Sequence, residues 1–123
     1  MVDRSTALAF SALAGASYAG VMYLSPATYL QLDEVEPSRE TQSLTRSAAA
    51  GIMGLTSFAY IALGDQHDVQ TAACCSLATS MLGYLGNNIY RLFSKPTLGA
   101  KVDTAASATL LILCTGALLK HKA

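Results

Sequence analysis

The chain has 123 residues, of which 52% are hydrophobic and only 13% are charged. An average soluble domain carries about 25% charged residues, so the composition favours one membrane domain covering residues 1–123. Lysine plus arginine and aspartate plus glutamate number eight each, which leaves no net charge to attract a nucleic acid. We therefore expect an all-α integral membrane protein with no nucleic-acid partner.

Four stretches contain no aspartate, glutamate, lysine or arginine: residues 5–32, 47–64, 69–90 and 104–119. A helix that crosses a bilayer needs about 20 mostly apolar residues. The pattern predicts a bundle of four transmembrane helices with antiparallel up-and-down topology, at residues 5–24, 44–64, 69–93 and 102–120. A soluble four-helix bundle is the alternative, but it would need a polar outer face, and residues 47–64 offer no charged one.

The first predicted span, residues 5–24, follows Asp3 and Arg4. Because Asp3 offsets the charge of Arg4, this start is a poor n-region for a cleaved signal peptide, and we expect a retained span. Pro26 should end or bend the helix. A polar loop over residues 25–43 follows, and its acidic residues are expected to lie in water.

The second helix is predicted to begin near Pro37, which suits a first helical turn. It should continue to Leu63, with its polar first turns projecting from the bilayer as a stalk. The positive-inside rule weakly favours the two longer loops, which carry the excess of basic residues, on the cytoplasmic or matrix side.

A short turn over residues 64–68 is predicted between the second and third helices. Gly64 is expected to cap the end of one helix and Asp68 the start of the next. So short a connection makes the two helices antiparallel neighbours. His67 is expected to be a solvated residue of this turn.

Near the end of the third span, Tyr84, Asn87, Asn88 and Arg91 recur at spacings of three and four, which places them on one helix face. One interpretation is a polar pocket for a lipid or quinone headgroup, with Arg46 at the entrance of the second span as a further candidate for a lipid phosphate. The other is that the asparagines hydrogen-bond to a neighbouring helix while the arginines mark the membrane surface. We favour the second interpretation, although the sequence leaves both open.

The fourth span, residues 102–120, follows a break at Pro96. No predicted span contains histidine, which excludes haem ligation by histidine within them, and no nucleotide, hydrolase or zinc motif occurs. The cysteines Cys74, Cys75 and Cys114 are expected to be reduced and to pack as small apolar residues. We therefore expect no catalytic residue, no metal and no cofactor.

Small residues recur at every fourth position within the predicted spans. Lipid tails provide no hydrophobic drive for helices to associate, so helices must pack where small residues let their backbones approach closely. The candidates for such packing are Gly15, Ala19, Gly20, Gly51, Gly54 and Gly83. The neighbouring helix could belong to this chain or to another protein.

Several positions together resemble the DoxX-like group of small four-helix membrane proteins. These proteins have a proline soon after the first span, here Pro26, and an arginine at the end of the third, here Arg91. Their second span opens with an arginine followed by spaced small residues, here Arg46, Gly51 and Gly54. The resemblance implies the four-helix fold and little about activity.

The sequence thus predicts a small non-catalytic membrane protein that is a structural or accessory subunit of a larger membrane complex. Membrane lipids and other membrane subunits would be its partners. An energy-transducing organelle membrane, the mitochondrial inner membrane, is the expected location. The alternative is a small carrier or a lipid- or quinone-handling protein with a polar pocket near the end of the third span.

Overall fold

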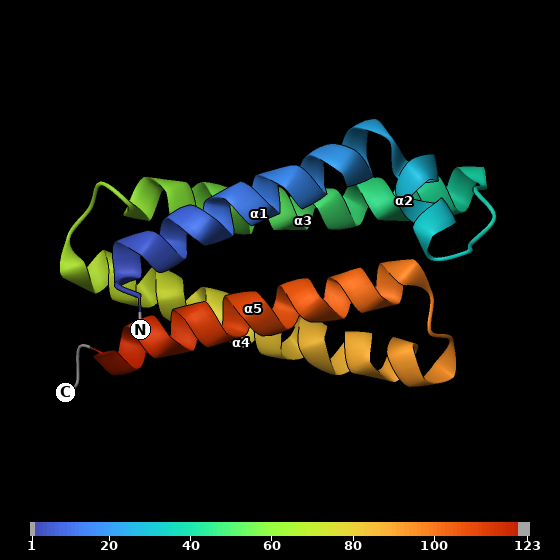
Figure 1. Ribbon diagram of the computed structural model, residues 1–123. Helices are drawn as coiled ribbons and strands as arrows, with labels where there is room; N and C mark the ends of the chain where they lie inside the picture. Colours follow the sequence, from blue (N-terminus) through green and yellow to red (C-terminus); the bar gives the residue numbers. More distant parts are fainter. Residues whose placement is uncertain (1, 121–123) are drawn as a thin grey trace.

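The computed structural model describes residues 2–120 of the chain. These residues form the α-helices α1 (Arg4–Leu24), α2 (Pro26–Leu32), α3 (Arg39–Ala62), α4 (His67–Ser94) and α5 (Leu98–Lys120), and they contain no β-strand. The four long helices alternate in direction along an elongated bundle (Figure 1). The prediction of an all-α fold is confirmed.

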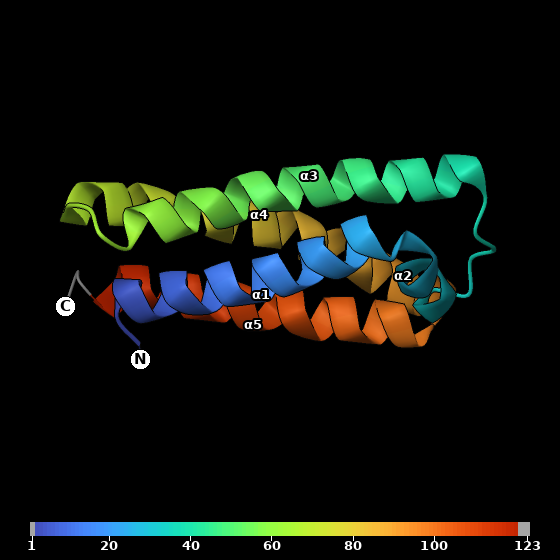
Figure 2. The ribbon, with the colours of Figure 1, turned by 90° about the horizontal axis from the view of Figure 1, so that it is seen from above.

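The long helices are arranged as two closely packed pairs, α1 with α3 and α4 with α5. Figure 1 shows the pairs as two layers. Seen from above in Figure 2, α1 lies over α5 and α3 lies over α4, and these contacts between the layers are looser than those within a pair. The bundle therefore consists of two helical hairpins that meet along a less tightly packed seam.

Helix α1 approaches α3 closely at Gly15. A Cβ atom at this position would overlap with the side chain of Thr56 on α3, so the two helices can pack this closely only because residue 15 is glycine. Ala19, one turn further along α1, is buried as well. Gly15 therefore lies at a close contact with α3, and Ala19 lies in the buried part of α1.

The other predicted packing glycines are placed differently. A Cβ atom at Gly20, Gly51, Gly54 or Gly83 would meet no atom within 4 Å. These four residues therefore do not hold helices of this chain together in the described part of the structure. That they pack against a second protein stays a prediction.

The predicted polar loop over residues 25–43 contains the short helix α2. Pro26 occupies its first turn, and both Pro26 and Leu30 are buried because α2 packs against α1, α3 and α5. Helix α2 also contacts α3, and that the polar first turns of α3 project from a bilayer stays a prediction. Helix α3 also begins later than predicted because Ser38 caps it: the amide of Thr41 donates to Ser38 Oγ at 3.1 Å.

The turn between α3 and α4 differs from the prediction in its caps. Leu63 and Gln66 occupy the cap positions instead of Gly64 and Asp68. His67 is exposed but is not simply solvated, because it lies within hydrogen-bond distance of Arg4, whose Nη1 is 2.8 Å from His67 Nδ1. This contact ties the turn to the start of α1.

Large apolar side chains lie on the outside of all four long helices. Helices α1 and α5 are long and apolar enough to cross a membrane, and only 28% and 22% of the residues in their most apolar stretches are buried. Helices α3 and α4 are not identified as candidate spans by length and hydropathy. They nevertheless also expose bulky apolar residues. The exposed residues include Phe10, Leu13, Tyr60, Ile61, Leu82, Ile89, Phe93, Val102 and Ile112.

Candidate functional site

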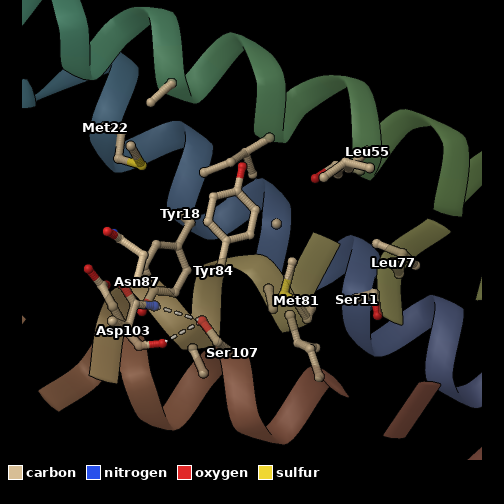
Figure 3. Close-up of a pocket in the computed structure, with 18 of the residues that line it drawn as sticks. Ser11, Tyr18, Met22, Leu55, Leu77, Met81, Tyr84, Asn87, Asp103 and Ser107 are labelled. Carbon is tan, nitrogen blue, oxygen red and sulfur yellow. Dashed lines mark hydrogen bonds between the residues drawn. The ribbon is translucent and has the colours of Figure 1, made fainter. Parts of the chain in front are cut away.

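A cavity of about 220 Å³ lies between the two helix pairs. Its walls are mostly apolar over much of their length, and Figure 3 shows the side chains of Tyr18 and Tyr84 within it. Towards the end of the bundle that carries α2, the lining becomes polar. The apolar walls are formed by Met22, Ile52, Leu55, Leu77, Met81 and Leu110.

Asp103 of α5 is at the centre of the polar end. Its side chain is only 8% exposed, and its Oδ2 accepts hydrogen bonds from Tyr29 Oη at 2.8 Å and from Arg91 Nη1 at 3.0 Å. A buried carboxylate needs such partners because leaving water is costly for a charge. Helices α2, α4 and α5 are thereby joined at one carboxylate.

Arg91 bridges Asp103 to a second carboxylate, Asp33. Its Nη2 forms an ion pair with Asp33, whose Oδ1 also accepts from Thr97 Oγ1 at 3.0 Å. The expectation that Asp33 lies in water is therefore wrong: α2 returns the chain towards the start of α5, where Asp33 is largely buried. Gly99 permits this approach, since a Cβ atom there would overlap with Asp33.

The predicted polar stripe on α4 divides into two parts. Asn88 is buried, and its Nδ2 donates to Ser107 Oγ at 2.9 Å while its Oδ1 accepts from Arg91 at 3.0 Å. Ser107 in turn donates to the backbone oxygen of Asp103, as the dashed lines in Figure 3 show. Asn88 thus makes the hydrogen bond to a neighbouring helix that one interpretation of the sequence requires.

Tyr84 and Asn87 line the cavity and make no side-chain hydrogen bond within the described chain. Arg46, the fifth candidate for a pocket, does not line it. Its Nε donates to the backbone oxygen of Tyr23 at 3.2 Å on the outer surface. The structure therefore brings together four of the five candidate pocket residues and leaves Arg46 apart.

Two tyrosines complete the polar end. Burial, together with the negative charge of Asp103, raises the pKa of Tyr29 well above its ordinary value, so this phenol remains a protonated donor. The hydroxyl of Tyr18 is buried near the Asp103 carboxylate but outside hydrogen-bond geometry, and it has no partner within the described residues. The cavity thus contains an unused hydroxyl donor.

The cavity opens towards one side of the bundle. Three of its lining residues, Ala48, Tyr84 and Asn87, are exposed, and all three belong to α3 and α4. The lining residues from α1 and α5 are buried or half-buried. We conclude that the opening lies between α3 and α4.

The three cysteines lie away from the polar end. Cys74 and Cys114 are buried, whereas Cys75 is exposed. The Sγ of Cys114 lies 3.6 Å from Ser11 Oγ, at the far end of the cavity lining. Within residues 2–120, no group of three or more histidine, cysteine or acidic residues could hold a metal ion.

Comparison of the chain with models of known protein families, with curated proteins and with solved structures finds no match in any of the three. The likeness to DoxX-like proteins therefore stays a prediction based on the residues named for it. Function must be inferred from the geometry of the cavity, because a fold alone does not define an activity.

Proposed function

We propose that the protein is a multi-pass membrane protein that binds an amphiphile, a lipid or a quinone, in the cavity between its helix pairs. The observation that carries this proposal is one cavity with apolar walls, a hydrogen-bonding end and an opening between α3 and α4. An apolar site with a few convergent polar groups is the usual form of a small-molecule site. A lateral opening suits a ligand that enters from the hydrocarbon of a bilayer.

Four membrane spans are supported by lengths and by surface chemistry. Helices α3 and α4 have 24 and 28 residues, which at about 1.5 Å per residue exceed the roughly 30 Å hydrocarbon thickness of a bilayer. The bulky apolar side chains exposed on all four long helices would be unfavourable in water. A location in the mitochondrial inner membrane stays a prediction from the sequence.

This topology can be tested by cysteine labelling. In a Cys75→Ala background, which removes the exposed native thiol, Ser38→Cys and Lys95→Cys should react with an impermeant maleimide from one side of sealed vesicles. Asp65→Cys should react only from the opposite side, because it lies at the other end of the bundle. Labelling of all three from one side would contradict the four-span arrangement.

The binding proposal can be tested at the opening of the cavity. Ala48→Phe places a ring where the cavity opens, whereas Ala50→Phe changes an exposed alanine of the same helix outside the cavity. The ring would occupy space that the ligand needs, and a loss of about 1.4 kcal/mol of binding free energy would weaken amphiphile binding about tenfold and lower its occupancy. Native mass spectrometry of the protein released from vesicles of defined lipid and quinone content measures this occupancy.

Wild-type protein and Ala50→Phe should retain the bound molecule equally. Equal occupancy in Ala48→Phe would show that the amphiphile does not use this cavity, and the proposal would fail. Far-ultraviolet circular dichroism of the three proteins shows whether the fold is the same in each.

An accessory subunit of a larger membrane complex is the second candidate function. It is favoured by the open surroundings of Gly20, Gly51, Gly54 and Gly83, where a helix of another protein could approach closely. Gentle solubilisation followed by native mass measurement distinguishes the two functions. A stable complex with other membrane proteins favours the subunit, and a lone chain with a bound small molecule favours the binding protein.

A further inference from the structure

We infer that the cavity selects an uncharged, ring-sized headgroup that accepts hydrogen bonds, as a quinone head does, and that it rejects anionic phospholipid heads. This inference rests on the proposed function and adds the chemical class of the ligand. It follows from the charge of the polar end, from the hydrogen-bonding groups that remain unused there, and from the size of the cavity.

The charge of the polar end disfavours an anion. Among the described residues that line the cavity, Arg91 is the one cation. Its Nη1 contacts Asp103 and Asn88, and its Nη2 pairs with Asp33. One guanidinium thus pairs with two carboxylates. The cluster of Asp33, Arg91 and Asp103 therefore has an excess of negative charge and no free cation for a phosphate. Arg46, the other candidate for binding a lipid phosphate, cannot provide this cation because it lies outside the cavity.

The unused groups of the cavity are uncharged. The hydroxyl of Tyr18 is buried near Asp103 without a hydrogen-bond partner in good geometry among the described residues. Tyr84 and Asn87 make no side-chain hydrogen bond within residues 2–120. A phenol hydroxyl and an amide nitrogen can both donate. For Tyr18 a buried donor without a partner costs free energy, so an oxygen acceptor on a bound headgroup would be stabilised beside it, with Tyr84 and Asn87 at the opening as further donors.

The size of the cavity limits the headgroup to about one ring. A cavity of about 150 Å³ holds one benzene molecule, and this cavity measures about 220 Å³. It can therefore hold a substituted six-membered ring but not a whole two-chain lipid. An apolar tail attached to the ring would leave through the opening between α3 and α4, past Ala48.

The experiment compares two probes on protein reconstituted in phosphatidylcholine nanodiscs, decyl-benzoquinone and dilauroyl phosphatidic acid. The double variant Tyr18→Phe/Tyr84→Phe removes both cavity hydroxyls. Its matched control, Tyr23→Phe/Tyr90→Phe, removes hydroxyls from two exposed tyrosines of the same helices that do not line the cavity. Each lost hydrogen bond weakens binding about two- to tenfold. Calorimetric titration should therefore show about tenfold weaker quinone binding in the cavity variant and no change in the control.

The outcomes separate this inference from the function on which it rests. If phosphatidic acid binds more tightly than the quinone and Ala48→Phe blocks this binding, the inference about the headgroup is wrong. The proposed binding function would still hold. The inference is also wrong if Tyr18→Phe/Tyr84→Phe binds the quinone with the same affinity as the wild type. Binding of both probes that is unaffected by Ala48→Phe would overturn both.

Discussion

Arg91→Leu is expected to lower the free energy of unfolding by about 3 kcal/mol, which is at the low end for breaking a buried ion pair. The low end applies because 27% of the Arg91 side chain is exposed. The variant would leave the carboxylates of Asp33 and Asp103 close together without a cation, and it would also remove the partner of Asn88 Oδ1. The loss is measured by titrating the protein with sodium dodecyl sulfate at neutral pH and monitoring unfolding by circular dichroism.

Arg46→Leu is the matched control, because this arginine is exposed and makes one hydrogen bond to a backbone oxygen. Its replacement should change stability by no more than about 0.5 kcal/mol. Adding Asp103→Leu to Arg91→Leu removes one of the two stranded charges and should restore part of the loss. If Arg91→Leu unfolds at the same detergent fraction as Arg46→Leu, the cluster contributes no net stability.

Gly15→Ala is expected to destabilise the bundle by about 1–3 kcal/mol, the usual cost of extra atoms in a packed contact. The new Cβ would overlap with Thr56 Oγ1 and lie 3.3 Å from Thr56 Cβ. The Thr56 side chain would have to rotate or α1 and α3 would have to separate, and the cavity between the pairs would change shape, since Gly15 and Thr56 both line it. The same detergent titration measures the effect.

Gly20→Ala, on the same helix, provides the comparison. Its Cβ would meet no atom within 4 Å, and alanine is the better helix former by about 1 kcal/mol. We expect unchanged or higher stability for Gly20→Ala. Combining Gly15→Ala with Thr56→Ala should recover part of the loss, because the two residues are in contact. If the effects of the two substitutions on the free energy of unfolding are fully additive, the contact between Gly15 and Thr56 does not determine how closely the helices approach.

The four long helices could be predicted from the sequence because each one coincides with a long stretch that lacks charges. The short helix α2 could not. Its seven residues include Tyr29 and Gln31 and lie within a region rich in polar residues, and a helix this short depends on tertiary packing for its stability. Without α2, the burial of Asp33 cannot be predicted, since it depends on how α2 places the following residue.

The candidate site was predicted in part. Helical spacing alone identified Tyr84, Asn87, Asn88 and Arg91, because spacings of three and four define a face. The same reasoning overlooked Asp103, although a carboxylate inside a predicted span marks a functional position by default. Tyr18 and Tyr29 carry no such signal, because they join the site through the packing of α1 and α2 against α5. Spacing also could not show that Arg91 is paired with Asp33 and Asp103. This pairing makes Arg91 a weaker candidate for binding an anion.

The division of the bundle into two hairpins has a consequence for how the chain is assembled during its synthesis. Arg91 and Asp103 both belong to the second hairpin and contact each other at 3.0 Å across the short connection between α4 and α5. In the membrane setting that we propose, this hairpin can enter the bilayer with its cation and its buried carboxylate already neutralising each other. The first hairpin then contributes Asp33 and Tyr29 when the two halves dock. The second hairpin therefore does not have to expose an unpaired Arg91 to the hydrocarbon.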